Sequence, residues 1–343
     1  MFIKNNINID NEIYKIILSP QNDKNKIRMS KLLSYSLLIL TMLLWAGNFH
    51  VVKIALTYYS PLSVATFRFL FCIITLFFIL GIQWKKNYLL LLSLTRKDWW
   101  YSFLVGFFGI FLTIYFFNIG LKSTSAINGS LIISTSPAIT GLFGTFLLKK
   151  PLKKQQWLAI TISFFGVVII LTKGDFSRFI ALKFEVGDLY IMAMAIVFSY
   201  SQILISKHLP HISSIITTSV SSLFALILFC AFSLSELTSY TIPEDFSFWA
   251  SILFMGVLGS GLAYTAFYHA VVDLGPNLST LSMNLIPLFT ILLASPFGEE
   301  IYNIQLLGGF LVIAGLLIYN RQNLKTTNFN LLNRLSYRNN NHK

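Results

Sequence analysis

The sequence has few charged residues and few cysteines. Only 11% of its 343 residues are charged, far below the roughly 25% of soluble domains. The two cysteines, Cys72 and Cys230, lie in separate apolar stretches without paired spacing, so they give no sign of a disulfide framework or a metal site. We also find no nucleophile elbow, metal-ligand cluster or nucleic-acid motif, and therefore predict no cofactor and no nucleic-acid partner.

What the sequence does have is hydrophobic length. Hydrophobic residues make up 55% of the chain and aromatic residues 15%. Apolar stretches of about 20 residues recur, each long enough to cross roughly 30 Å of hydrocarbon as a helix. The sequence therefore predicts an all-α integral membrane protein with ten transmembrane helices. The expected spans are residues 32–56, 61–82, 99–121, 124–148, 155–172, 187–206, 213–234, 248–271, 276–297 and 304–320.

Lysine and arginine residues gather in alternate loops. They are frequent in the N-terminal tail (1–31), in the loops 83–98 and 149–154, and in the C-terminal tail (321–343). Because cytoplasmic loops carry the excess of basic residues, both termini are predicted to be cytoplasmic. The polar N-terminal tail leaves either Met1 or Met29 as the translation start.

The two halves of the sequence resemble each other. The matching positions are GFFG at 106–109 with GVLG at 256–259, Pro137 with Pro287, and Gln156 and Gly166 with Gln305 and Gly315. We therefore predict two five-helix repeats, 32–172 and 187–320, joined by a loop at 173–186. Because five is odd, the second repeat must be inverted, an arrangement common in secondary transporters that work by alternating access.

Several segments carry a family resemblance. They are LLWAGNFHVVKIAL (43–56), SPLSVATFRFL (60–70), the spans with Pro137 and Pro287, and Glu299–Glu300 followed by QLLGGFLVIAGLL from Gln305. As an ordered set they resemble the drug/metabolite transporter superfamily, specifically EamA-type permeases, over roughly residues 32–320. The resemblance implies solute export or exchange across the bacterial inner membrane without a bound cofactor.

Two cations lie within the predicted spans. A charged group near the middle of a membrane helix costs at least about 2.5–3.5 kcal/mol, so it is a functional candidate. Lys53 and Arg68 are expected in the same half of the membrane, where they could attract a substrate carboxylate or phosphate. The alternatives are snorkelling of Lys53 to the interface and a structural bond from Arg68 to helix-end carbonyls.

Other polar residues mark where helices could face a substrate cavity. They are Asn48, His50, Tyr115, Asn118, Asn128, Ser134, Tyr264, Tyr268, His269 and Asn284. The histidines could carry protons or simply pack, and Pro137 and Pro287 could free backbone carbonyls or only kink their helices. No Asp or Glu lies at the middle of a span, which disfavours a carboxylate proton relay.

These patterns predict a transporter that exports or exchanges a small metabolite, such as an amino acid or a related compound. The alternatives are an uptake or exchange carrier for a charged, nucleotide-like solute, and drug efflux. An integral membrane enzyme would need a clustered acid, base or metal site, which the short loops do not offer. The expected partners are a small-molecule substrate and membrane lipid, and the sequence does not fix the direction, the coupling ion or the oligomeric state.

Overall fold

The computed structural model describes residues 24–82, 84–124, 126–175, 177, 180, 185–237, 244–294 and 302–320. Within these ranges the chain is helical and has no strand. Nine of the described helices are long and apolar enough to cross a membrane, and a shorter apolar helix covers Leu131–Leu147. The predicted all-α membrane class is confirmed, whereas the described residues provide nine full-length spans rather than ten.

The helices follow one another in two similar series. The first series is α2 (Lys24–Ala55), α3 (Pro61–Ile82), α4 (Trp84–Leu92), α5 (Arg96–Leu104), η1 (Val105–Leu112), α6 (Thr113–Ser123), α7 (Ala126–Ile133), α8 (Ser136–Leu147) and α9 (Lys154–Thr172). The second is α11 (Val186–His208), α12 (Ser214–Leu237), α13 (Phe246–Leu253), η2 (Phe254–Leu262), α14 (Ala263–Leu274), α15 (Pro276–Leu281), η3 (Ser282–Asn284), α16 (Leu285–Ala294) and a last helix at Asn303–Asn320. Helix α4 lies in a region that the sequence predicts as a loop.

The fourth and ninth spans are interrupted at corresponding places. Helices α7 and α8 are separated at residues 134–135, and Pro137 lies in the first turn of α8. In the second series, the 3₁₀ turn η3 separates α15 from α16, which contains Pro287. Proline lacks an N–H and clashes with the preceding turn, which explains why the continuous helix expected at 124–148 is split in two.

The third span of each series contains a π-helical stretch, η1 or η2, which holds the two glycine pairs of the repeat. A Cβ atom on Gly106 would lie 2.5 Å from the carbonyl oxygen of Ser221, and one on Gly256 would lie 2.7 Å from that of Arg68. Since Cβ atoms do not approach backbone this closely, both positions need glycine. These matched contacts make Arg68 and Ser221 equivalent residues of the two repeats.

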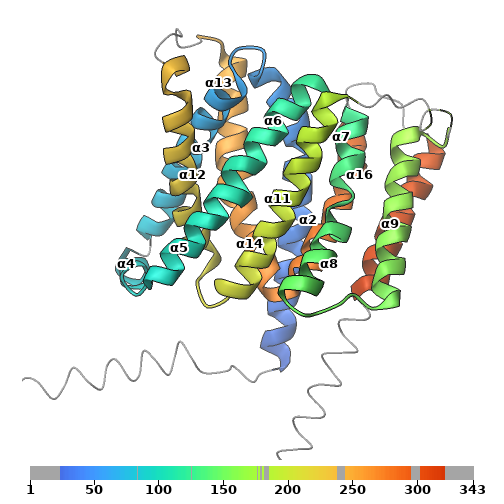
Figure 1. The fold of residues 1–343 in the computed structure, drawn as a ribbon, viewed down its shortest axis with the longest axis horizontal. Helices are drawn as coiled ribbons and strands as arrows, with labels where there is room; N and C mark the ends of the chain where they lie inside the picture. Colours follow the sequence, from blue (N-terminus) through green and yellow to red (C-terminus); the bar gives the residue numbers. More distant parts are fainter. Residues whose placement is uncertain are drawn as a thin grey trace, which may run out of the picture.

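The two series run through the bundle in opposite directions. Figure 1 shows α2 and α11 near the centre of the view with opposed directions, and α9 at one edge beside the last helix. At this edge a Cβ on Gly166 would lie 2.6 Å from the Gly308 carbonyl oxygen, and one on Gly315 would lie 2.7 Å from that of Ala159. The two-repeat architecture predicted from the sequence is therefore present.

The beginning of the first described helix and the end of the last one meet on one side of the bundle. The hydroxyl of Tyr35 donates to the side-chain oxygen of Asn320 at 2.5 Å, and that of Ser34 donates to Asp273 at 2.6 Å. Asp273 ends α14, and the chain then turns at Gly275, whose φ of 93° suits glycine. The start of the first repeat and the end of the second thus lie on the same face of the bundle.

Candidate functional site

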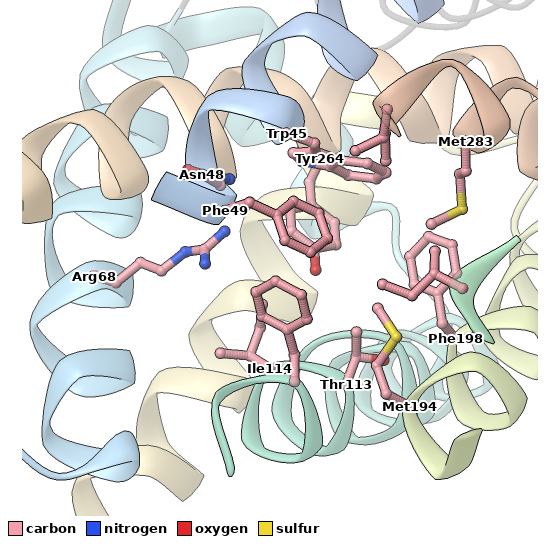
Figure 2. Close-up of a pocket in the computed structure, with 13 residues that line it drawn as sticks. Trp45, Asn48, Phe49, Arg68, Thr113, Ile114, Met194, Phe198, Tyr264 and Met283 are labelled. Carbon is pink, nitrogen blue, oxygen red and sulfur yellow. The ribbon is translucent and has the colours of Figure 1, made fainter. Parts of the chain in front are cut away.

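A small cavity lies between the two repeats. It has a volume of about 50 Å³, and its walls come from both helix series. The lining residues are Trp45, Asn48, Phe49, Arg68, Thr113, Ile114, Phe117, Ile133, Met194, Phe198, Tyr264, Met283 and Ile286. Figure 2 shows their side chains arranged around one space. Ligand pockets usually measure about 300–1,000 Å³, so this cavity must widen to hold a metabolite.

Helix α2 presents one face to the cavity. Trp45, Asn48 and Phe49 line it, at the spacing of three and four residues that places side chains on one side of a helix. His50 and Lys53 lie off this face and are exposed on the bundle surface. The structure therefore separates Lys53 from Arg68, because the helical period turns the lysine away from the cavity.

Arg68 of α3 reaches the cavity from a fully protein-enclosed position. The residue is only 2% exposed. Its Nε donates to Ser260 Oγ at 2.6 Å, and one terminal nitrogen donates to the Gly259 carbonyl oxygen at 3.4 Å. Among the described residues, no carboxylate lies within 4 Å of the guanidinium. Of its five N–H groups, those not used on η2 remain available on the cavity side, where Figure 2 shows the guanidinium.

The π-helical stretch η2 organises this corner of the cavity. The carbonyl oxygen of Gly259 also accepts a hydrogen bond from Trp45 Nε1 at 3.1 Å. A Cβ on Gly259 would lie 2.5 Å from the amide group of Asn48, so the absence of a side chain lets Asn48 pack directly on η2. π-Helical turns often occur at functional sites because they expose backbone groups, and here Gly259 binds two of the lining side chains.

Aromatic rings and thioethers form the rest of the wall. The ring centroid of Trp45 lies 5.6 Å from that of Tyr264, 5.0 Å from that of Phe267 and 6.0 Å from that of Phe198. Trp45 and Phe198 come from α2 and α11, so this contact joins the two repeats. No sequence signal distinguishes Trp45, Phe198 or the methionines as site residues, because such residues are common on any membrane helix.

Of the polar candidates, Asn48, Arg68 and Tyr264 line the cavity together. Asn118 and Asn284 have structural partners instead: their side-chain nitrogens donate to the Pro61 carbonyl oxygen at 3.0 Å and to Ser163 Oγ at 2.9 Å. The remaining buried candidates, which are not among the lining residues, are Ser134, Pro137, Tyr268 and Pro287.

The other candidates lie elsewhere. His269 belongs to a separate cavity of about 710 Å³, bounded mainly by apolar residues of α2, α3 and α14. Tyr115 is partly exposed and stacks on Phe111, with centroids 6.2 Å apart. Asn128 lies in α7, but its side chain is outside the part of the chain that the structure describes.

The family assignment follows from a comparison with known sequences. A family model described as the EamA-like transporter family matches residues 32–172 and 185–321. The chain belongs to the EamA-like transporter family.

Relatives of this EamA-like transporter are named as transporters too. It is 29% identical to the uncharacterized transporter YyaM of Bacillus subtilis (strain 168), over 84% of this chain and 94% of that protein. It is 25% identical to a probable amino-acid metabolite efflux pump of Salmonella typhimurium, over 82% of this chain and 93% of the relative. A solved crystal structure superposes with a TM-score of 0.65 at 17% identity, covering 85% of this chain and 96% of that chain, which shows the fold alone.

Contacts between the repeats occur at both ends of the EamA-like bundle. At one end, His211 in the loop after α11 contacts Asp98 of α5, with 3.0 Å between Nε2 and Oδ1. At the other, Tyr58 in the loop after α2 donates a hydrogen bond to Asp245, the N-cap of α13. Each contact joins the loop after the first helix of one repeat to the third span of the other repeat. The two contacts therefore occupy matched positions in the two repeats.

Proposed function

We propose that this membrane protein exports or exchanges a small metabolite that has a carboxylate group, such as an amino acid or a related compound, by alternating access. The observation that carries the proposal is Arg68, which lines the cavity between the repeats without a carboxylate partner among the described residues. Burial of a charge is costly unless the charge is paired. A substrate carboxylate would supply the missing partner and form bidentate hydrogen bonds with a guanidinium.

The alternative role for Arg68, a structural bond to helix carbonyls, accounts for only part of its hydrogen bonding. Ser260 and Gly259 of η2 accept from Nε and from one terminal nitrogen. These bonds fix the side chain against η2 and orient the rest of the guanidinium toward the cavity (Figure 2). Arg68 is thus both anchored and still able to bind a ligand.

Alternating access is supported by the small size of the cavity and by the contacts between the repeats. Its volume of about 50 Å³ holds only a few water molecules, and the His211–Asp98 and Tyr58–Asp245 contacts join the repeats at opposite ends. In an alternating-access cycle these two contacts would break in turn. Repeats related by an in-plane axis move in this way around a site near the bilayer midplane.

The charge of the cavity also separates the alternatives. A nucleotide-like solute carries several negative charges, whereas one cation lines the cavity. A neutral hydrophobic drug would leave that cation unpaired. The relative named as a probable amino-acid metabolite efflux pump supports outward movement of the substrate. The basic loops support a cytoplasmic location for both termini.

Counterflow in proteoliposomes tests the proposal. Purified protein is reconstituted, the vesicles are preloaded with one unlabelled amino acid or organic anion, and uptake of the same labelled compound is followed. Saturable counterflow of one class, lost in Arg68→Gln, is expected. Folded protein that gives no counterflow across the whole panel, or counterflow that is unchanged in Arg68→Gln, would contradict it.

A further inference from the structure

We infer that the cavity selects monocarboxylates with an aromatic or branched apolar body over zwitterionic amino acids of the same shape. This inference rests on the proposed transport function and specifies the substrate class of the same site. It follows from three features of the lining residues: their net charge, the direction of their hydrogen-bond donors and the apolar character of the opposite wall.

The charge balance of the cavity is one-sided. Arg68 is the charged residue among the lining residues, and the other polar side chains there are Asn48, Thr113 and Tyr264. No Asp or Glu belongs to the lining. A monocarboxylate would neutralise Arg68. An amino acid would also bring an ammonium group, which would lose its water without gaining a counter-charge, and this loss is costly in an apolar site.

The polar groups at the charged end donate hydrogen bonds. Figure 2 shows the amide nitrogen of Asn48, the guanidinium of Arg68 and the hydroxyl of Tyr264 turned toward the same space. The side-chain oxygen of Asn48 is enclosed by protein and has no hydrogen-bond partner, so it faces away from the cavity. Thr113 is occupied, because its hydroxyl donates to the Phe108 carbonyl oxygen at 2.8 Å. Three donors therefore surround one site for an oxyanion.

The opposite wall suits an apolar body. Phe198, Met194 and Met283 line it, and Trp45 packs edge-to-face on Phe198 with a centroid distance of 6.0 Å. Aromatic rings favour edge-to-face contacts with other rings, and methionine side chains adapt to irregular apolar shapes. Once the cavity widens, an aryl or branched alkyl group would pack against these residues while its carboxylate contacts Arg68.

Titration calorimetry with three matched compounds tests the inference. The compounds are 3-phenylpropionate, phenylalanine, which adds an ammonium to the same skeleton, and phenethylamine, which lacks the carboxylate. At pH 7 we expect purified protein to bind 3-phenylpropionate at least about tenfold more tightly than phenylalanine and to bind no phenethylamine. Arg68→Gln should weaken binding of the acid by about 10–100-fold, whereas Ser221→Ala, at the equivalent position of the other repeat, should not change it.

Three results would overturn the inference: phenylalanine that binds as tightly as 3-phenylpropionate, detectable binding of phenethylamine, or no binding of 3-phenylpropionate to folded protein. Each of these results is separable from failure of the transport proposal. Counterflow of an amino acid, for instance, would establish transport while refuting the preference for monocarboxylates.

Discussion

The two repeats have similar backbones but unequal side chains at the cavity. Gly106 packs on Ser221 as Gly256 packs on Arg68, and Gly109 packs on Ser201 as Gly259 packs on Asn48. The first repeat thus provides an arginine and an asparagine where the second provides two serines. The comparison indicates that repeat symmetry determines how the helices pack, whereas the departures from symmetry determine what the cavity binds.

The largest effect should come from removing the charge that only one repeat has. Arg68→Gln should lower the transport rate at low substrate concentration by about 10–100-fold, because a charge-assisted hydrogen bond contributes about 1.5–3 kcal/mol. Ser221→Ala should leave the rate unchanged. The measurement is initial counterflow in vesicles with equal amounts of folded protein, and equal losses in both variants would mean that the asymmetry has no role in binding.

Packing, in contrast, should respond equally in the two repeats. Gly106→Ala and Gly256→Ala each place a Cβ within 2.7 Å of a backbone oxygen, and such overpacking costs about 1–3 kcal/mol. Both should lower the apparent Tm of the purified protein. Gly81→Ala is the control, because a Cβ there would meet nothing within 4 Å. A normal Tm for only one of the two variants would break the predicted equivalence.

A smaller difference should separate the N-terminal caps of the two edge helices. The side-chain oxygen of Gln156 accepts from the Lys153 N–H at 2.9 Å, and that of Gln305 accepts from the Tyr302 N–H at 3.0 Å. Only Gln305 also donates to another helix, to the Ile170 carbonyl oxygen at 2.9 Å. Gln305→Ala should therefore cost about 1–2 kcal/mol and Gln156→Ala at most about 1 kcal/mol.

Thermal unfolding of the two variants side by side measures that difference. The same loss of Tm in both would show that the inter-helix bond of Gln305 adds no stability, and a larger loss in Gln156→Ala would reverse the predicted order.

The smallest effect concerns the contact between Tyr58 and Asp245 at one end of the bundle. Hydrogen bonds from Tyr58 and from Ser247 hold the pKa of the exposed Asp245 carboxyl below its usual value. Because this pKa is lower in the folded state, the carboxylate stabilises the fold at pH values above its unfolded-state pKa of about 3.9. This stabilisation is lost as the pH falls through the folded-state pKa. Asp245→Asn should therefore lower the Tm slightly at pH 7, and this difference should shrink as the pH falls below about 3.9. A Tm difference that does not change with pH would contradict this assignment.

Hydropathy and repetition predicted most of the fold. The expected spans at 61–82 and 304–320 agree with Pro61–Ile82 and Asn303–Asn320 to within a residue, because the ends of these helices coincide with the ends of apolar runs. The helix α4 was not predicted, and the prolines at 137 and 287 indicated freed carbonyls or a kink without indicating that the fourth span divides into two helices. Both depend on local backbone geometry that a window of average hydropathy does not register.

The candidate site was predicted less completely. Arg68, Asn48 and Tyr264 could be selected because polar groups are rare in membrane helices. The same reasoning selected His50 and Lys53, which the structure places on the bundle surface. Trp45 and Phe198 could not be distinguished from lipid-facing aromatic residues. Which face of each helix turns inward depends on the packing of the whole bundle, and one sequence does not contain that information in readable form.

The single positive charge at Arg68 has an energetic consequence for the direction of transport. A monoanion that leaves a cell whose interior is negative by 100 mV moves down the electrical gradient and releases about 2.3 kcal/mol. This amount corresponds to an approximately 50-fold concentration ratio. An exporter with such a substrate can therefore be driven by the membrane voltage itself, without a co-transported proton, and the same voltage opposes accumulation of the substrate inside the cell.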